Sequence, residues 1–493
     1  MFEPTWESVR THQVPEWYDD AKLGIFLHWG LYSVPGWAPQ VPNIQDLLQH
    51  HGPKAMLRDN PYAEWYMNSM QIEGSPTQQH HRRTYGADYP YHRFAETFDE
   101  QSADADLDAL AGLCADAGAR YVVLTTKHHE GFALWPTELQ NPSRPGFIAQ
   151  RDLVGDLTES VRAKGMRMGL YYSGGYDWTY NGYVMHRPAD AMLATPSSAE
   201  YREYATAHVR ELIDRYAPSV LWNDICWPGG GNLAELFAHY YNSVEDGVIN
   251  DRWIESSTLR NTVADTLTGA VGDVMQAVWK FIPADKKTLT FPGAKHFDFT
   301  TPEYAKSDTI LEKKWESTRG VGHSFGANRN ERPQDIVTTT ELVRSFCDII
   351  SKNGNLLIGI GPGPDGVIPE EQQAPVRGLG EWMKVNGSAV YGTRPWKIAQ
   401  TTTSEGTDVR FTQGGGTQGD GVVNAFLIDT PGRRSFTLRG VDASKLGTVD
   451  MLGVKGAISH SVDDGELTVT LPERLPVSAA HVLRLHGDLR PTR

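Results

Sequence analysis

Short apolar runs alternate with longer amphipathic segments from about residue 20 to residue 360. Within the runs, apolar residues follow one another instead of alternating with polar ones, which is typical of parallel strands covered on both faces. The runs that we predict to be buried strands are YVVLTT (121–126), MRMGLYY (166–172), SVLW (219–222), GVIN (247–250) and NLLIGIG (355–361).

The segments between these runs carry apolar residues at helical spacing. Leu153, Leu157 and Val161 recur every four residues, and similar stripes occupy residues 205–216 and 342–350. This spacing places the apolar residues on one face of a helix, which can then pack on a sheet. Strands that alternate with such helices predict a parallel α/β fold.

Polar and aromatic clusters follow nearly every predicted strand and decide between two α/β architectures. The clusters are HWG (28–30), KHHEG (127–131), YYSGGYDW (171–178), WND (222–224) and NDRW (250–253). In a barrel, one ring of strand ends builds the active site. No GxGxxG follows the first strand and no GxxxxGK[ST] occurs, which disfavours nucleotide-binding folds. We therefore predict a (β/α)8-like TIM barrel over residues 1–395.

After Trp396 the pattern changes to short β-rich runs separated by Gly, Asp and Pro turns. The runs are TDVRFTQ (407–413), GVVNAFLID (421–429), SFTLRG (435–440), ELTVTLP (466–472) and HVLRLHG (481–487). This pattern predicts an antiparallel β-sandwich over residues 396–493. Its expected role is to cap the barrel, and binding of carbohydrate is the alternative.

Composition narrows the class of partner. The net charge of −15 argues against nucleic acid and against an anionic membrane as partners. No apolar run approaches the roughly 20 residues that a membrane-spanning helix needs. The three cysteines form no CxxC pair, and no basic stretch followed by an apolar one opens the chain, so a reducing, cytoplasmic location is expected.

Two features stand out as candidate chemistry. Asp224 ends an apolar strand, where it is either the N-cap of a following helix or a catalytic carboxylate. His128 and His129 are adjacent, and side chains of adjacent strand residues point to opposite sides, so joint binding of one metal ion is awkward. Sugar hydroxyls and ordinary packing remain the two interpretations of this pair. No HxH or HExxH motif occurs, and no metal is predicted.

Ten motifs, in one order from about residue 5 to residue 396, resemble those of glycoside hydrolase family 29, the α-L-fucosidases. They are KLGIFLHWGLYSVPGW (22–37), NPYAEWY (60–66), TTKHHEGFALW (125–135), RDLVGDL (151–157), YYSGGYDW (171–178), LWND (221–224), NDRW (250–253), TTPEY (300–304), SKNGNLLIGIGPGPDGVIPEEQ (351–372) and GEWMKVNGSAVYGT (380–393).

The resemblance implies a retaining exo-glycosidase that hydrolyses terminal α-L-fucosides through a covalent fucosyl-enzyme intermediate, without a cofactor or metal. It implies Asp224 as the nucleophile and Glu303 as the acid/base. The implied substrate-binding residues are His28, Glu64, Trp65, His128, His129, Tyr171, Trp222, Arg252 and Phe325. The expected partner is a fucosylated oligosaccharide or glycoside, and because relatives are often oligomers a homo-oligomer is expected by analogy.

The chain departs from the family pattern in three places, and one further residue leaves the acid/base assignment open. Residues of about 254–296 look like an insertion directly before Glu303. Glu316 competes with Glu303 for the acid/base role, and its structural alternative is an ion pair with Arg319. Gly359 stands where an asparagine is usual. Ala327 replaces a common aromatic residue, which could open the side of the site where the aglycone leaves.

Overall fold

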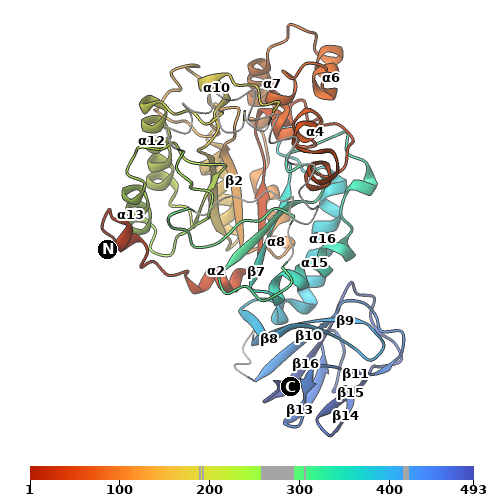
Figure 1. The fold of residues 1–493 in the computed structure, drawn as a ribbon. Coiled ribbons are helices and arrows are strands. Elements are labelled where there is room, and N and C mark those ends of the chain that lie inside the picture. The colour runs from red at the N-terminus through yellow and green to blue at the C-terminus, as the bar shows by residue number, and fades with distance from the viewer. Residues whose placement is uncertain (188–189, 191–193, 257–293, 305–306, 415–420, 493) are drawn as a thin grey trace.

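The computed structural model describes residues 1–187, 190, 194–256, 294–304, 307–414 and 421–492. Most of the expected insertion lies outside the described residues. Figure 1 shows a barrel-like domain that contains the N-terminus and, below it, an antiparallel β-unit that contains the C-terminus. None of the described helices is both long and apolar enough to cross a membrane.

Seven parallel strands form the sheet of the first domain. Their spatial order is β5-β4-β3-β2-β1-β7-β6, and every neighbouring pair is parallel. The strands are β1 (Leu23–Leu27), β2 (Tyr121–Lys127), β3 (Arg167–Ser173), β4 (Val220–Asp224), β5 (Val248–Ile249), β6 (Trp315–Gly320) and β7 (Gly354–Ile360). The five runs predicted from the apolar pattern correspond to β2, β3, β4, β5 and β7.

An eighth segment, residues 298–304, lies between the two edge strands and closes the sheet into a ring. Phe299 forms a parallel bridge to Asn250, directly after β5. Thr300 and Glu303 form parallel bridges to Trp315 and Thr318 of β6. Because this segment pairs with both edges, the ring has eight positions, and Glu303 lies at one of them.

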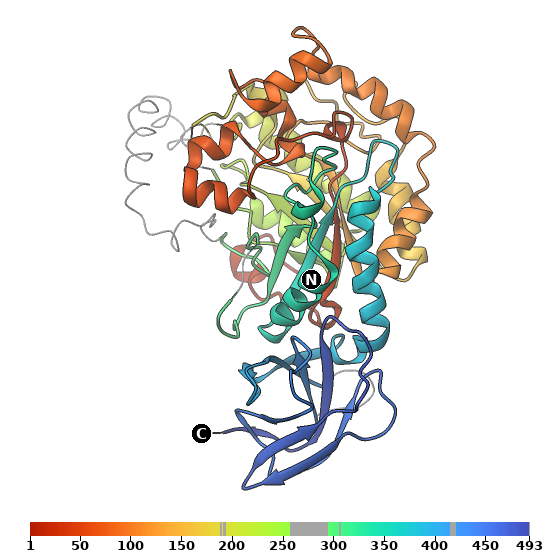
Figure 2. The ribbon, with the colours of Figure 1, turned by 90° about the vertical axis from the view of Figure 1, so that its right-hand side faces the viewer.

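Helices surround the ring, as Figures 1 and 2 show. The long ones are α8 (Leu107–Asp116), α9 (Leu153–Ala163), α12 (Ala199–Tyr216), α13 (Leu233–Ser243), α15 (Thr339–Ser351) and α16 (Glu370–Asn386). The three predicted helical stripes correspond to α9, α12 and α15. Each of these begins at a side chain that accepts a backbone N–H, namely Asp152, Ser198 and Thr338.

A long connection between β1 and β2 contributes short helices near the strand ends. They are η1 (Leu31–Ser33), α3 (Ile44–Asp46), η2 (Leu47–His51), α4 (Pro53–Arg58), η3 (Ala63–Trp65), α5 (Tyr66–Ser69), α6 (Pro76–Thr84), η4 (Tyr91–Arg93) and α7 (Phe94–Ser102). Before β1 lie α1 (Trp6–Val9) and α2 (Glu16–Ala21), and after β3 lies α10 (Trp178–Asn181). The connection brings two predicted site residues, Glu64 and Trp65, to the barrel.

Two apolar layers explain why the strands read as continuous apolar runs. In β1, Leu23, Ile25 and Leu27 pack in the large cluster that joins the sheet to its helices. Phe26 faces the other way into a smaller cluster with residues of the other strands. The inner cluster consists of Tyr18, Ala21, Phe26, Tyr121, Val123, Tyr171, Val220, Trp222, Val248, Phe299 and Leu357. Both faces of the sheet are therefore buried.

The second unit consists of antiparallel sheets with their own apolar core. One sheet has the order β13-β16-β10-β9-β8 and another has the order β11-β15-β14. The strands are β8 (Thr393–Thr402), β9 (Asp408–Gly414), β10 (Val422–Leu427), β11 (Ser435–Leu438), β12 (Val441–Asp442), β13 (Leu446–Met451), β14 (Ser459–Asp463), β15 (Glu466–Thr470), β16 (His481–Gly487) and β17 (Arg490–Pro491). The predicted fold, a TIM-barrel-like domain followed by a β-sandwich, is confirmed.

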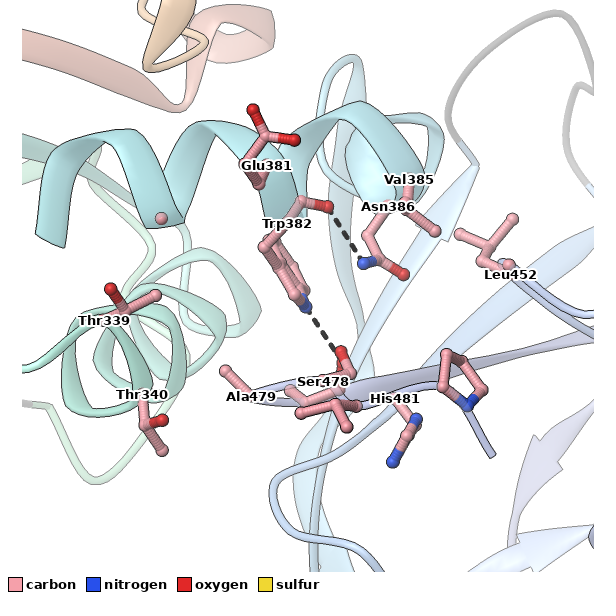
Figure 3. Close-up of a pocket in the computed structure, with 15 residues that line it drawn as sticks. Thr339, Thr340, Glu381, Trp382, Val385, Asn386, Leu452, Ser478, Ala479 and His481 are labelled. Carbon is pink, nitrogen blue, oxygen red and sulfur yellow. Dashed lines mark hydrogen bonds between the residues drawn. The ribbon is translucent and has the colours of Figure 1, made fainter. Parts of the chain in front are cut away.

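The β-sandwich contacts the barrel through α15 and α16. Figure 2 shows α16, in cyan, running along the barrel toward the sandwich. The Trp382 indole of α16 donates to the Ala480 carbonyl at 2.9 Å, beside a cavity of about 400 Å³ (Figure 3). Arg410 of β9 donates to Asp348 of α15 at 2.5 Å. These contacts lie at the end of the barrel away from α4 and α6 (Figure 1).

The packing inside the ring predicts a specific sensitivity at Gly24. A Cβ there would overlap the Tyr121 ring and lie 2.9 Å from Leu357 Cδ1. We expect Gly24→Ala to lower the free energy of unfolding by about 1–3 kcal/mol, because the barrel interior has no space for the methyl group. Thermal and denaturant unfolding would measure the change.

Gly112→Ala is the matched control for Gly24→Ala. Gly112 lies inside α8, and the nearest described atom outside that helix to a Cβ there would be Lys164 Cε, at 3.7 Å. This substitution should leave stability unchanged or raise it by up to about 1 kcal/mol. Equal unfolding midpoints for Gly24→Ala and the wild type would contradict the packing described here.

Candidate active site

Asp224 is the last residue of β4, at the carboxyl-terminal edge of the ring, and three groups donate to its carboxylate. Oδ1 accepts from Arg252 Nη1 and from the backbone N–H of Ile225, both at 2.8 Å. Oδ2 accepts from the Tyr171 hydroxyl at 2.8 Å, and His129 Nε2 lies 3.8 Å from the same oxygen. These contacts fix the orientation of the Asp224 carboxylate at the edge of the ring.

Arg252 joins Asp224 to Glu303. Its second terminal nitrogen, Nη2, lies 2.8 Å from Glu303 Oε1, and Tyr62 donates to Glu303 Oε2 at 3.2 Å. Arg252 also donates to the side chain and carbonyl of Thr301, each at 3.0 Å. Burial disfavours the guanidinium charge, but the carboxylates of Glu303 and Asp224 outweigh it and raise the pKa of Arg252. Two predicted catalytic carboxylates thus contact one buried cation.

The residue after each of these carboxylates has an unusual backbone conformation. Ile225 has φ of 69° and Tyr304 has φ of 51°, in the left-handed region. Such a conformation costs of order 1–3 kcal/mol in a residue other than glycine, and a β-branched residue is especially rare there. It persists only where surrounding contacts enforce it, and such strain clusters at functional sites.

His128 and His129 lie side by side, with ring centroids 3.9 Å apart. The expectation that they point to opposite sides is wrong, because β2 ends at Lys127 and the histidines occupy the turn closed by Gly131 N–H and His128 O. Strand alternation therefore does not apply to them. Both rings face the predicted site, where His128 stacks on Tyr171 with a centroid distance of 5.7 Å.

The hydrogen bonds of His129 define which ring nitrogen carries the proton. Ser173 donates its only hydroxyl proton to the Tyr176 carbonyl at 2.7 Å. The 2.6 Å contact between Ser173 Oγ and His129 Nδ1 therefore requires that Nδ1 donates. Burial lowers the pKa of His129 well below its usual value, so the ring is neutral. Nε2 is then an acceptor that faces Asp224.

His28 follows β1 and completes the histidine group. Its ring centroid lies 5.9 Å from that of His128 and 5.0 Å from that of Phe325. Burial lowers the pKa of His28 well below its usual value. Within the part of the chain that the structure describes, Nδ1 of His28 is buried without a hydrogen-bond partner, and Nδ1 of His128 has only the Glu130 carboxylate nearby, at 3.5 Å. Buried polar atoms of this kind suit the hydroxyl groups of a ligand.

Glu64 and Phe325 meet through the loop after β6. Glu64 Oε2 accepts from Ser324 Oγ at 3.0 Å and from Gly326 N–H at 2.9 Å, and burial raises its pKa. Phe325 lies between these two donors. A Cβ at Gly359 would lie 2.8 Å from Phe325 Cδ1, so the glycine found in place of the usual asparagine leaves space for this ring.

Two tryptophans contribute apolar surface at the same site. Trp65 meets His129 edge to face at 5.5 Å. The Trp222 ring stacks on Tyr171 at 5.5 Å, and the Arg252 guanidinium carbon lies 4.6 Å from its centroid. Ten of the eleven predicted site residues are therefore in one connected group of contacts, and the eleventh, Glu64, bonds the residues on either side of Phe325. Aromatic rings next to hydroxyl-binding groups are suited to a small sugar with one apolar face.

Glu316 has a different environment from the one expected. It is fully buried in the barrel interior and accepts from Tyr18, Tyr121 and Trp222. The ion pair with Arg319 is not formed among the described contacts, because Arg319 stacks on Tyr304 and donates to the Gly320 carbonyl. Glu303 keeps some solvent exposure, with 14% of its side chain accessible, which favours it over Glu316 as a proton donor to a ligand.

Sequence reasoning missed the residues that hold the site residues in place. Tyr62 contacts Glu303, Ser173 contacts His129, Thr301 contacts Arg252 and Ser324 contacts Glu64. Three of the four lie inside the motifs that resemble a family, so the motifs themselves were the available signal. Their partners could not be inferred, because each contact joins segments far apart in the chain.

Two groups of side chains are close enough to hold a metal ion among the described residues. In the first, His128, His129 and Asp224, the Asp224 oxygens already accept from Tyr171 and Arg252. The other group is His12, His296 and Asp298. There His12 bonds Asp298 at 2.8 Å and the Tyr241 hydroxyl bonds both His296 and Asp298. In this second group the donors and acceptors satisfy one another, whereas in the first group donors occupy both Asp224 oxygens.

Comparison with known proteins gives one consistent family. The family model described as Alpha-L-fucosidase matches residues 1–388. An α-L-fucosidase of Dictyostelium discoideum is 30% identical over 472 residues, 92% of this chain and 87% of that protein. The human tissue α-L-fucosidase is 27% identical over 488 residues, 97% and 89% of the two chains. The Thermotoga maritima α-fucosidase solved with a mechanism-based inhibitor is 38% identical, with a TM-score of 0.82 and coverage of 99% and 100%.

The charge arrangement at the site predicts how stability depends on Arg252. In Arg252→Met, two buried carboxylates face each other without a cation, which should lower the free energy of unfolding by about 3–5 kcal/mol at neutral pH. The loss should shrink near pH 4, because protonation removes the repulsion between the carboxylates. Thermal unfolding at both pH values would measure it.

Arg319→Met is the matched control. Arg319 is half-buried and stacks on Tyr304 at 5.5 Å. Its replacement should cost less than about 1 kcal/mol and show no comparable pH dependence. If Arg252→Met loses no more stability than this control at neutral pH, Arg252 does not compensate the two carboxylates.

Proposed function

The chain belongs to the α-L-fucosidase family, and we propose that it hydrolyses terminal α-L-fucosides with net retention through a covalent fucosyl-enzyme intermediate. The observation that supports this most directly is the contact of Asp224 and Glu303 with two nitrogens of one guanidinium. Retaining glycosidases hold their two carboxyl groups about 5–5.5 Å apart, with no room for an intervening water. Two carboxylates on one Arg252 are compatible with this short separation.

Asp224 is the proposed nucleophile. In the first step, one of its oxygens forms a bond to the anomeric carbon while the glycosidic bond breaks, and Glu303 gives its proton to the departing oxygen. In the second step, Glu303 takes a proton from a water that attacks the anomeric carbon, and the bond to Asp224 breaks. The product is free fucose with its original anomeric configuration.

The balance of charge supports Glu303 as the proton carrier. If both carboxylates are ionised, Asp224, Glu303 and Arg252 together have one uncompensated negative charge in a largely buried site. One added proton removes it. Asp224 accepts from three donors through both oxygens, whereas Glu303 has two partners and keeps 14% of its side chain exposed, and we assign the proton transfer to Glu303.

The remaining site residues fit a deoxy sugar. The neutral rings of His28 and His129 can bond hydroxyls, and Glu64 can accept from them. Trp65, Trp222 and Phe325 supply apolar surface for the C–H face and the C5 methyl group. Fucose lacks a 6-hydroxyl, and an apolar wall at that position leaves the hydroxyl of a galactose-like sugar unpaired.

The proposed roles predict distinct kinetics for variants of the two carboxylates. With an aryl α-L-fucoside, Glu303→Ala should lower kcat by about 10²–10⁴-fold, because it removes the general acid/base. Asp224→Ala should lower kcat at least as far, and Asp224→Gly with azide should release a fucosyl azide of inverted configuration. The exposed Glu312→Ala is the control and should retain full activity.

The stereochemistry is tested by proton NMR, which shows the anomeric configuration of the fucose that is released first. Release of the β anomer first from an α-fucoside would refute retention. A preference of less than tenfold for an α-L-fucoside over a β-D-galactoside would refute the substrate assignment in favour of another retaining barrel glycosidase. Binding of fucosides without any turnover by the wild type would favour a non-catalytic sugar-binding protein.

We also expect activity to be independent of metal ions. Both Asp224 oxygens already accept hydrogen bonds: Oδ2, the oxygen nearest His129 Nε2, accepts from the Tyr171 hydroxyl, and Oδ1 accepts from Arg252. Prolonged treatment with EDTA should therefore leave kcat/KM unchanged. Loss of activity with EDTA that added Zn²⁺ restores would contradict this expectation and support a metal-dependent hydrolase.

A further inference from the structure

Glu316 is a fully buried carboxylate that the proposed mechanism does not use. Burial raises its pKa, while hydrogen bonds from Tyr121, Tyr18 and Trp222 and the more distant charge of Lys314 oppose that rise. No lysine or arginine nitrogen lies within ion-pair distance of it in the described part of the chain. Burying a carboxyl group without a cation is costly, and such a group needs a reason to be there.

Every hydrogen bond described for Glu316 is one that its carboxylate accepts. Oε2 accepts from the hydroxyls of Tyr18 and Tyr121, and Oε1 accepts from the Trp222 indole at 3.1 Å. Only a carboxylate accepts on both of its oxygens without donating. A glutamine would turn its NH₂ group toward at least one of these donors. Gly24 adds to the arrangement, because a Cβ there would overlap the Tyr121 ring.

Trp222 links Glu316 to the proposed nucleophile. The bond from its indole nitrogen fixes the rotation of the ring, which stacks on Tyr171 with an interplanar angle of 22° and lies 4.6 Å from the Arg252 guanidinium carbon. Tyr171 donates to Asp224 Oδ2 and Arg252 donates to Oδ1. The two side chains that orient Asp224 therefore both pack on the ring that Glu316 holds.

We propose that Glu316 is a positioning residue for the reaction. It holds the Trp222 indole in the orientation that aims Tyr171 and Arg252 at the two oxygens of Asp224, and it does not contact the sugar. This inference rests on the proposed function, in which Asp224 is the nucleophile. Glu316, which the sequence left as a competitor of Glu303 for the acid/base role, thus has a different role in the barrel interior.

Glu316→Gln tests the proposal through kinetics and pH dependence. We expect kcat/KM for an aryl α-L-fucoside to fall about 10–100-fold, mostly in kcat, because displacement of catalytic groups by about 1 Å can cost 10²-fold. The acid limb of the kcat/KM profile should move to higher pH, since a nucleophile that has lost a donor binds a proton more readily. The titratable groups that face Asp224 are Tyr171, Arg252, His129 and, across Arg252, Glu303, and the variant replaces none of these residues.

Trp222→Phe provides a second route to the same result and keeps an aromatic ring in the core. It should move the acid limb in the same direction, and the double variant with Glu316→Gln should be no worse than the more impaired single variant. Tyr18→Phe is the matched control, because it removes one donor to Glu316 but leaves the indole bond. It should change kcat/KM by less than threefold and leave the acid limb in place.

Three results would overturn the proposal. They are an unmoved acid limb in Glu316→Gln, additive losses in the double variant, and a loss in Tyr18→Phe as large as that in Glu316→Gln.

Thermal melts of every variant identify the variants that fold. If Glu316→Gln does not fold, the kinetics of Trp222→Phe and Tyr18→Phe test the proposal in its place. If the wild type turns over a fucoside and Asp224→Ala does not, wild-type kinetics in Glu316→Gln refute only this inference. Absence of turnover by the wild type refutes the proposed function first.

Discussion

The contact of one guanidinium with two carboxylates is the constraint on which the site depends. Arg252, Asp224 and Glu303 are largely buried, and each would be costly there alone. Together they compensate one another, and the geometry of the guanidinium sets where the two carboxylates lie. Any arrangement of strands that misplaced one of the three would leave a buried charge without a partner. The fold has to deliver all three to one edge of the ring.

The barrel does so by using consecutive positions around that edge. Asp224 ends β4, Arg252 follows β5, and Glu303 lies on segment 298–304 between β5 and β6. Neighbouring parallel strands have their carboxyl ends side by side, so these residues converge although about 80 residues of sequence separate the first from the last. The connection between β1 and β2 then brings Glu64 and Trp65 over the same edge.

Much of this arrangement could be predicted from sequence, for identifiable physical reasons. Strands buried on both faces give continuous apolar runs, and Asp224 was recognisable because a polar cluster ended such a run. Segment 298–304 and β6 gave no such signal. The sequence of β6, WESTRG, is not a continuous apolar run, because Glu316 accepts hydrogen bonds inside the barrel and the Trp315 indole donates to the Lys352 carbonyl. Segment 298–304 pairs with its neighbours through isolated bridges. The side-by-side placement of His128 and His129 depends on a turn whose conformation adjacent residues alone do not determine.

The site lowers the free energy of unfolding, which explains why residues far from the catalytic carboxylates are needed to stabilise it. Ile225 and Tyr304 adopt left-handed conformations directly after the two carboxylates, and His28 Nδ1 is buried at the site without a partner among the described residues. Each of these features opposes folding, and each keeps a reactive group in place before the substrate arrives. The apolar layers on both faces of the sheet provide the opposing stability. Rigid packing is useful here because groups that are already oriented need not reorganise as charge develops at the anomeric carbon. The hydrogen bonds around Glu316 in the barrel interior would then contribute to catalysis as well as to the packing of the core.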